Sequence, residues 1–279
     1  MPKTVFYNGK FYGKRSAVIP ICDRSIFFGD AVYDAVIGHD GGLFLLDEHL
    51  ERLITNAKRL DLPTPYTIER LRSISYNVVK KSKLREYFLY IQLSRCSEER
   101  THAYPSSQGA SLLMTVSPFS LSPPEKRLKL VTTADKRYGF CNVKTVNLLP
   151  AVIASHGAEA AGCDEAIFVR DGFITECAHS NIAILKDDIL ITHPDSPKIL
   201  PGIAKKHLLF AAHDEGIGVV ERPFSTEELF SADEVLITST TKICLAACEV
   251  NGMTIGGKAG KTLEILQKKL FSEYANWTM

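Results

Sequence analysis

Two consecutive prolines divide the chain. The segment SLSPPEKR, at positions 120–127, places Pro123 and Pro124 between serines and charged residues. Because proline fixes φ and has no N–H, neither residue fits inside a helix or a central strand. A chain of 279 residues is long enough for one large domain or two modest ones. We therefore expect a domain over 1–119, a linker over 120–128 and a second domain over 129–279.

The charge balance excludes several classes of protein. Of the 279 residues, 45% are apolar, and 33 Lys and Arg against 32 Asp and Glu leave a formal net charge of +1. This apolar content is enough for a packed core, which excludes a disordered chain. A near-neutral chain with scattered cations has no general attraction for a phosphate backbone or an anionic bilayer. We therefore expect no nucleic-acid partner and no membrane partner.

Cysteine usage and the first residues indicate the compartment. The seven cysteines are an odd number and contain no C-x-x-C pair, so a disulfide framework or a zinc site is not expected. The first residues, MPKTVFYNGKFYG, lack the apolar run of a signal peptide. No apolar run approaches the roughly 18 residues needed to span a bilayer. These features predict a cytoplasmic protein.

The first half alternates strands and helices. Residues 1–46 have the pattern of short strands and turns, including an Asn-Gly hairpin signal in TVFYNGKFY. Asp47 is the predicted N-cap of an amphipathic helix that ends before Pro63, and a second helix is expected at about 67–81. Two strand-like runs follow, YFLYIQLS and ASLLMTVSPF. This order predicts an α+β domain.

The second half mixes strands with four expected helices. A strand, LKLVTTA, precedes a small-residue helix at about 148–161, and a hairpin turns at Asp171-Gly172. Further helices are expected at about 204–215 and 260–274, with a short one after the capping-box pair Ser225 and Glu228. The strand DEVLITS lies between the last two helices. We expect an α/β domain.

Lys144 and Glu176 are candidates for cofactor chemistry. Lys144 lies in CNVKTVNLLPAV, a polar stretch before the small-residue helix. It is either a solvated loop lysine or an amine that forms a Schiff base. Glu176 interrupts the apolar strand FITECA and either points to solvent or faces a cation or a protonated heterocyclic nitrogen. An isolated carboxylate in that strand would be costly to bury.

Two segments have the pattern of anion sites. The sequence LPGIA, at 200–204, leads into a helix N-terminus, where N–H groups and the helix dipole favour a phosphate. Ser239-Thr240-Thr241 follows a strand and supplies hydroxyls and further amides. Ordinary turn chemistry is the alternative for each segment.

Three cationic side chains complete the candidates. Arg100 and His102 lie in a long polar loop and are either solvated charges or a clamp for a substrate carboxylate. Arg52 lies on the first predicted helix. It is either a surface charge or a fixed cation for a phosphorylated cofactor.

Together these segments resemble the fold-type IV pyridoxal 5′-phosphate enzymes, and within them the D-amino-acid aminotransferases. The resemblance covers almost the whole chain. It implies a two-domain fold, with a smaller N-terminal α+β domain, a larger, barrel-like C-terminal α/β domain and the cofactor in the cleft between them. The motifs that carry it are RSIFFGDAVYDAV at 24–36, DEHLERL at 47–53, KTVNLLPAVIASHGAEAAGCDEAI at 144–167, ITECAHSN, ILPGI and TSTT.

The resemblance assigns a role to each candidate. Lys144 becomes the Schiff-base lysine and the acid–base, and Glu176 the partner of the pyridine nitrogen. The other cofactor-binding positions that it implies are Arg52, Ser180, Ile203, Ala204, Ser239 and Thr240. The substrate carboxylate is assigned to Tyr33, Arg100 and His102.

The implied reaction is transamination. A D-amino acid such as D-alanine gives its amino group to the cofactor, and a 2-oxo acid, pyruvate or 2-oxoglutarate, takes it up in a ping-pong cycle. In the family the Arg and His reach in from the partner subunit, which implies a homodimer with shared active sites. The alternatives are an L-branched-chain aminotransferase, an aminodeoxychorismate lyase and a non-catalytic cofactor-binding protein. Arg100 and His102 argue against the first two, and Lys144 with Glu176 against the third.

The chain departs from the family pattern in two places. Cys177, Ala178 and His179 stand where small glycine and serine residues are common, and Ser180 is retained. Ala204 replaces a threonine hydroxyl of the phosphate site. One lost hydrogen bond of this kind weakens cofactor binding by about 1 kcal/mol.

Overall fold

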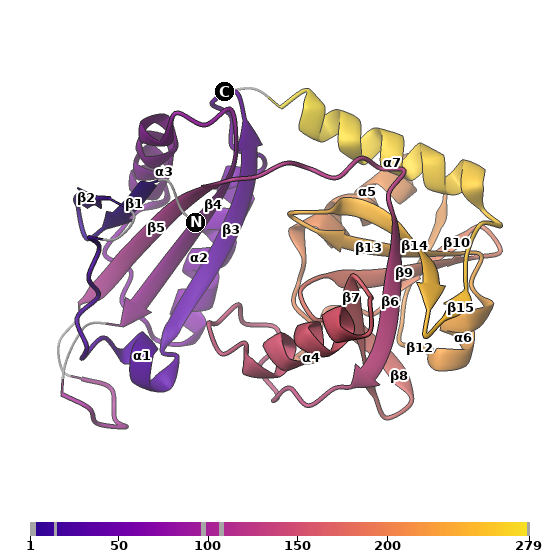
Figure 1. Ribbon diagram of the computed structural model, residues 1–279, viewed down its shortest axis with the longest axis horizontal. Coiled ribbons are helices and arrows are strands. Elements are labelled where there is room, and N and C mark those ends of the chain that lie inside the picture. Colours follow the sequence, from indigo (N-terminus) through magenta and orange to yellow (C-terminus); the bar gives the residue numbers. More distant parts are fainter. Residues whose placement is uncertain (1–3, 14–15, 96–98, 106–108, 278–279) are drawn as a thin grey trace. The chain divides into compact units, whose positions relative to one another are not determined.

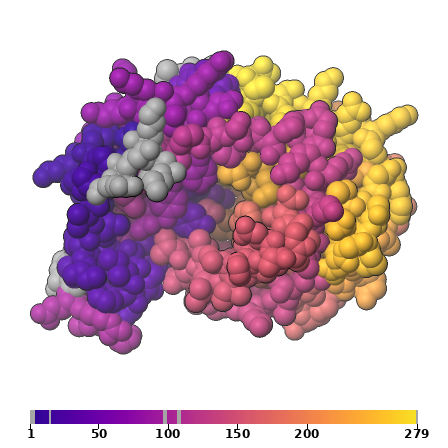
Figure 2. Space-filling view, viewed as in Figure 1, coloured from indigo at the N-terminus to yellow at the C-terminus, as the bar shows by residue number. Residues whose placement is uncertain are grey.

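The computed structural model describes residues 4–13, 16–95, 99–105 and 109–277, and its chain forms two compact units. Figure 1 traces the chain, and Figure 2 shows its surface from the same side. Unit 1 comprises residues 1–120, 143–147 and 277–279, and unit 2 comprises 121–142 and 148–276. The break after Ser120 lies in the expected linker, but a strand already begins at Arg127 and the segment 143–147 returns to unit 1.

Unit 1 is a five-stranded antiparallel sheet in the order β2-β1-β5-β4-β3. The predicted Asn-Gly hairpin is confirmed, because Asn8 and Gly9 adopt φ of 43° and 86° in the turn between β1 and β2. The strands are β1 Thr4–Tyr7, β2 Lys10–Tyr12, β3 Ala31–His39, β4 Glu86–Arg95 and β5 Ala110–Pro118. The helices are α1 Arg24–Phe28, α2 Leu46–Arg59 and α3 Ile68–Ser82.

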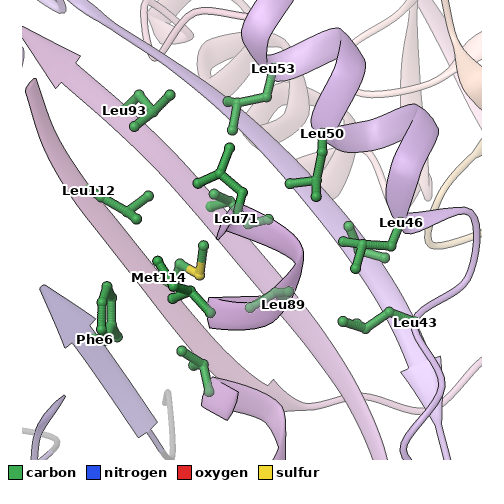
Figure 3. Packing of buried hydrophobic residues seen from close by; sticks show 14 of the residues in the cluster. Phe6, Leu43, Leu46, Leu50, Leu53, Leu71, Leu89, Leu93, Leu112 and Met114 are labelled. Carbon is green, nitrogen blue, oxygen red and sulfur yellow. The ribbon is translucent and has the colours of Figure 1, made fainter. Parts of the chain in front are cut away.

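The core of unit 1 lies on one face of this sheet. Leucines of α2 and α3 pack against β4 and β5, as Figure 3 shows for Leu50, Leu53 and Leu71 over Leu93 and Leu112. Full burial of each such side chain contributes about 1.5–3 kcal/mol. The helix-facing side of the sheet is therefore packed with apolar side chains. The opposite side carries polar and aromatic residues such as Tyr33 and Tyr90.

Two local predictions for unit 1 are wrong. Asp47 is not an N-cap, because α2 begins two residues earlier than expected, at Leu46, and its N-cap is Leu45, which adopts a left-handed φ of 53°. Asp47 instead lies in the first helical turn, where a carboxylate favours the helix dipole. Residues 1–46 also contain a helix, α1, whose N-cap Asp23 accepts a hydrogen bond from Ser25 N–H.

Unit 2 is a mixed ten-stranded sheet that curls into a half barrel (Figure 1). Its order is β11-β10-β9-β13-β14-β6-β7-β8-β12, with β15 paired to β14. This mixed sheet confirms the expected α/β character. The strands are β6 Arg127–Ala134, β7 Glu165–Arg170, β8 Phe173–Cys177, β9 Asn181–Lys186, β10 Ile189–Thr192, β11 Gly218–Glu221, β12 Phe224–Ser225, β13 Glu234–Ser239, β14 Ile243–Val250 and β15 Met253–Thr254.

The two faces of this sheet bury separate apolar clusters. Helices α5 and α7 cover one face, with Leu208 and Leu266 against Leu185, Leu236 and other strand residues. The opposite face closes on itself around the inward side chains of β6, β7, β9 and β13. The predicted capping box on α6 is confirmed. The helices of unit 2 are α4 Leu149–Ala160, α5 Ile203–Asp214, α6 Thr226–Ser231 and α7 Gly260–Ala275.

The linker is anchored to unit 2. Gln267 on α7 donates from Nε2 to the carbonyl of Pro124 at 3.0 Å. None of the helices in the described part of the chain has the length and apolar character needed to cross a bilayer.

Candidate active site

The candidate nucleophile, Lys144, belongs to unit 1. Its segment is joined to the start of β3, where Tyr33 N–H donates to the Lys144 carbonyl at 3.0 Å and Val32 forms a bridge with Thr145. Its Nζ lies 4.5 Å from the centroid of the Tyr33 ring, a distance at which an ammonium is attracted to the ring face. Tyr33 in turn stacks on Tyr90, with centroids 5.3 Å apart. The structure thus brings together two of the predicted site residues, Tyr33 and Lys144.

Arg52 is held by a buried carboxylate on the helix-facing side of β3. Its Nε and Nη2 each donate to Asp34 at 2.8 Å, and His49 Nδ1 lies 2.7 Å from the same carboxylate. Burial raises the pKa of Asp34, but Arg52 and His49 outweigh it and lower the pKa below its usual range. Burial lowers the pKa of His49, and the charges of Arg52 and Lys144 act in the same direction. A neutral His49 and an ionised Asp34 therefore fix the orientation of the guanidinium.

Arg100 and His102 lie against helix α1. The guanidinium carbon of Arg100 is 5.2 Å from the centroid of the Phe28 ring, and the His102 ring is 5.3 Å from that ring. Arg24 Nη1 donates to the carbonyl of Thr101 at 2.7 Å, which anchors the loop between them. The structure therefore brings Arg100 and His102 together on one ring, while Tyr33 contacts Tyr90 and Lys144. Residues 96–98 and 106–108 of this loop lie outside the described residues.

Glu176 is buried at the end of β8, with 5% of its surface exposed. Arg137 Nη1 donates to its Oε1, and its Oε2 accepts from Asn181 Nδ2 at 3.0 Å and from Leu200 N–H at 3.1 Å. Burial would lower the pKa of Arg137, but a hydrogen bond to Asp135 and the charges of Glu176 and Asp135 raise it. A permanently charged guanidinium therefore compensates the buried carboxylate. The sequence indicated that a cation could face Glu176 but did not identify Arg137.

The N-terminus of α5 is open to an anion. Its N-cap is Gly202, and among the described residues no side-chain hydrogen bond caps this end. The N–H groups of the first helical residues, Ile203 and Ala204, therefore have no side-chain cap and can donate to an anion. These are the groups to which the resemblance assigns phosphate binding.

Asn181 connects this helix to Glu176. Its Nδ2 donates to Glu176 and to the Leu200 carbonyl, at 3.0 and 2.9 Å. A Cβ added at Gly202 would lie 1.8 Å from Asn181 Oδ1, so the backbone approaches this amide as only glycine allows. Asn181 also pairs with Thr238 at the end of β13. Asn181 thus contacts Glu176 and the segment before α5 through its side chain and the end of β13 through its backbone, and the sequence did not single it out.

The remaining predicted residues surround the end of β13. Ser239 Oγ lies 3.3 Å from Thr241 Oγ1, and Lys242 N–H closes the turn on the Ser239 carbonyl at 3.2 Å. Thr240 is the central residue of this turn and is partly exposed. Ser180 donates from Oγ to the buried Glu165 at 3.0 Å, so in this structure its hydroxyl proton is directed to a carboxylate.

The donor set of unit 2 fits a phosphorylated heterocycle. An uncapped helix N-terminus and the hydroxyls of Ser239 and Thr240 suit a phosphate dianion. A buried carboxylate with a compensating guanidinium, Glu176 with Arg137, suits a ring nitrogen that donates a proton. Gly202 allows the backbone approach that a bulkier residue would block.

Comparison with known proteins supports this chemistry. Residues 31–250 match the model of the family described as amino-transferase class IV. The chain is 33% identical over 280 residues to a D-alanine aminotransferase of Bacillus licheniformis, covering 97% of this chain and 98% of that protein. It is 34% identical over 269 residues to a D-alanine aminotransferase of Staphylococcus epidermidis, covering 95% of each.

Solved structures show the same fold at lower identity. The branched-chain amino acid aminotransferase of Escherichia coli is 22% identical, with a TM-score of 0.89 over 98% of this chain and 95% of that one. A putative 4-amino-4-deoxychorismate lyase of Legionella pneumophila is 23% identical, with a TM-score of 0.86 over 93% and 97%. These two matches support the predicted two-domain fold and carry no information on substrate.

Proposed function

Because this chain belongs to the class IV aminotransferases, we propose that it transfers the amino group of D-amino acids to 2-oxo acids with pyridoxal 5′-phosphate as cofactor. The observation that carries the proposal is the donor set of unit 2, which matches both a phosphate and a protonated ring nitrogen. The preference for D-amino acids is supported by the full-length similarity to D-alanine aminotransferases. Arg100 and His102, in one loop, support it further.

The cofactor would be held at its phosphate and at its ring. Ile203 and Ala204 N–H groups, the hydroxyls of Ser239 and Thr240, and Arg52 are the proposed phosphate ligands. Glu176 is the proposed partner of the ring nitrogen, with Ser180 nearby in the same segment. When bound, pyridoxal 5′-phosphate supplies an electron sink for the bonds at the substrate α carbon.

Lys144 would bind the cofactor through a Schiff base at Nζ and move the proton at the substrate α carbon. Tyr33 orients this amine, since its ring lies under Nζ and its N–H fixes the Lys144 carbonyl. The short connection through Thr145 to β3 holds the nucleophile on a rigid strand. Such positioning lowers the entropy cost of reaction.

The substrate carboxylate would be bound by Tyr33, Arg100 and His102. In this structure Arg100 and His102 are exposed and rest on Phe28, within their own subunit. We propose that they serve the active site of a partner subunit in a homodimer. A guanidinium pairs with a carboxylate through two parallel hydrogen bonds, so this contact sets which face of the α carbon meets Lys144.

An exposed apolar helix supports the homodimer. Leu149, Val152 and Ile153 lie at i, i+3 and i+4 on α4 and are 69%, 57% and 64% exposed. Figure 2 shows α4 on the surface of the face viewed. A row of large apolar residues at helical spacing is typical of an interface rather than of a free surface.

A cytoplasmic location remains a prediction. The six described cysteines, all except Cys96, are free thiols, which suits a reducing compartment. Fractionation of cells of the source organism would test it.

Three parallel assays on the protein reconstituted with pyridoxal 5′-phosphate test the reaction. D-alanine and L-leucine are each supplied with 2-oxoglutarate, and aminodeoxychorismate is supplied alone with detection of pyruvate. We expect turnover with D-alanine. Faster turnover with L-leucine would assign a branched-chain aminotransferase, and pyruvate from aminodeoxychorismate would assign the lyase. Either result would contradict the proposal.

A further inference from the structure

A fully buried carboxylate contacts Ser180, one of the proposed cofactor-binding residues. Glu165, the first residue of β7, has none of its surface exposed. Its Oε1 accepts from His179 Nδ1 and from His179 N–H, each at 2.9 Å. Its Oε2 accepts from Ser180 Oγ and from Lys242 Nζ, each at 3.0 Å. Four donors therefore satisfy a charge that would otherwise be too costly to bury.

Lys242 uses all three protons of its ammonium in this cluster. Its Nζ lies 3.0 Å from Glu165 Oε2, 3.2 Å from His179 Nε2 and 3.4 Å from Ser180 Oγ. For His179 to accept at Nε2, its single proton must be on Nδ1, from which it donates to Glu165. Ser180 donates its proton to Glu165 and accepts from Lys242. Each proton in the cluster then has one acceptor.

The cluster joins the connection between β8 and β9 to the turn between β13 and β14. Strands β9 and β13 are neighbours, and Asn181 pairs with Thr238, so the two segments lie side by side at this end of the sheet. His179 and Ser180 belong to the first segment. These two residues follow Glu176, the proposed partner of the ring nitrogen. Lys242 follows Ser239 and Thr240, the proposed phosphate ligands. One ammonium thus links the segment that binds the ring to the turn that binds the phosphate.

The backbone directly after the turn 239–241 is strained at Ile243. Ile243 is buried and adopts a φ of 55°, in the left-handed region where a β-branched side chain is strained. Strain of this kind persists only where surrounding contacts hold it. The contacts that hold it are the pairing of Ile243 with Ser239, the packing of its side chain in the apolar cluster under α5 and α7, the hydrogen bond from Lys242 N–H to the Ser239 carbonyl and the three contacts of Lys242 Nζ.

We propose that Lys242 is a positioning residue, which fixes the phosphate-binding turn 239–241 to the segment after Glu176 through Glu165, His179 and Ser180. The inference rests on the proposed function, because it assigns the cofactor phosphate to this turn. Loss of Lys242 should therefore weaken the binding of pyridoxal 5′-phosphate through its phosphate and leave the binding through its ring unchanged.

The test compares two ligands on the apoprotein. Equilibrium dialysis measures the Kd for pyridoxal 5′-phosphate and for pyridoxal, which lacks the phosphate. For Lys242→Met we expect the Kd for pyridoxal 5′-phosphate to rise about tenfold, and the Kd for pyridoxal to change less than about twofold. Lys242→Arg, which keeps the charge, should recover part of the loss.

A matched control is Lys269→Met on α7. Lys269 also binds two carboxylates, Asp214 and Glu215, each at 3.1 Å, but on the surface. This variant should leave both Kd values unchanged. If Lys242→Met fails to fold, His179→Ser removes only one of the three contacts and should raise the same Kd by a smaller factor.

Two results would overturn the inference. An unchanged Kd for pyridoxal 5′-phosphate in Lys242→Met would show that the turn needs no anchor. An equal rise in the Kd for both ligands would show that the substitution acts on the fold in general. Absence of pyridoxal 5′-phosphate binding by the unsubstituted protein would instead overturn the proposed function, and the inference with it.

Discussion

At the scale of single residues, two buried glutamates of unit 2 have different compensating charges. Glu176 faces the guanidinium of Arg137 and also accepts from Leu200 N–H, next to the α5 N-terminus. Glu165 faces the ammonium of Lys242 and receives its other protons from His179 and Ser180. We therefore propose that Glu176 contacts the cofactor, and that Glu165 holds residues next to the cofactor site in place.

Lys144→Ala should abolish transamination while the protein stays folded. The side chain of Lys144 contacts the Tyr33 ring but is not part of the apolar core, so its loss removes little stability. The amine is the group to which we assign both cofactor binding and proton movement. Turnover of D-alanine and the thermal unfolding midpoint are the measurements. Turnover within about tenfold of the unsubstituted enzyme would contradict the assignment.

Glu165→Gln should remove a pH dependence of stability. Burial raises the pKa of Glu165, but hydrogen bonds from the side chain and the N–H of His179, together with the charge of Lys242, outweigh it and lower the pKa from 4.5 to about 2. A lowered pKa in the folded state stabilises the protein above about pH 4.5, and this stabilisation is lost as the pH falls toward 2.

Thermal unfolding of the two apoproteins between pH 7 and pH 3 measures this effect. The unsubstituted protein should have the higher midpoint at pH 7, and the difference should narrow as the pH falls below about 4.5. A difference that stays constant over this range would show that Glu165 is not held ionised by its neighbours.

At the scale of elements, local signals predicted local structure. Asn8-Gly9 predicted its turn and Ser225 with Glu228 its capping box, because both signals act within four residues. The start of α2 was misplaced, because a left-handed Leu45 is set by burial of its neighbours and not by capping chemistry.

The sequence motifs name candidate site residues, but they do not predict the tertiary contacts that hold those residues. Arg137 lies 39 positions before Glu176, and its contact with that carboxylate depends on how β6 and β8 are arranged. Asp34 and His49 come together only because α2 packs on β3. Asn181 is part of a quoted motif, but its role depends on Leu200 and Gly202, which lie beyond the β9–β10 hairpin that Asn181 begins.

Gly202→Ala should weaken cofactor binding through the start of α5. The added Cβ would lie 1.8 Å from Asn181 Oδ1, and that amide cannot move freely because it donates to Glu176 and Leu200. We expect the Kd for pyridoxal 5′-phosphate to rise at least tenfold, which corresponds to about 1.4 kcal/mol. Equilibrium dialysis measures it.

Gly260→Ala is the control for this variant. Gly260 begins α7, and a Cβ added there meets no atom within 4 Å. It should leave the Kd unchanged and should not lower the unfolding midpoint. Equal effects of the two substitutions would indicate that the close approach at Gly202 is not needed for binding.

At the scale of the whole molecule, a net charge of +1 is compatible with anionic ligands. The residues that we propose to bind the phosphate and the carboxylate are few: the guanidinium groups of Arg52 and Arg100, the imidazole of His102 and backbone N–H groups. Selectivity for anions is therefore a property of the site and not of the overall charge. The proposal of a second subunit rests on the exposed apolar side of α4.

Mixing two inactive variants tests whether active sites are shared. In a mixed dimer of Lys144→Ala and Arg100→Ala, one site receives an intact Lys144 from one subunit and an intact Arg100 from the other. Random pairing makes half of the dimers mixed, each with one working site, so about a quarter of full activity should return. Activity at low D-alanine concentration, after unfolding and refolding together, is the measurement. If the mixture is no more active than the two variants measured separately, Arg100 acts in the site of its own subunit or in no active site.

We assign D-amino acids as the substrates of this aminotransferase. A single half-reaction tests this assignment most directly: the enzyme loaded with pyridoxal 5′-phosphate is mixed with D-alanine or L-alanine without any 2-oxo acid, and released pyruvate is measured. We predict about one pyruvate per subunit with D-alanine and none above the blank with L-alanine, since each loaded site can take up one amino group. Release from L-alanine at the same rate or faster would contradict the account.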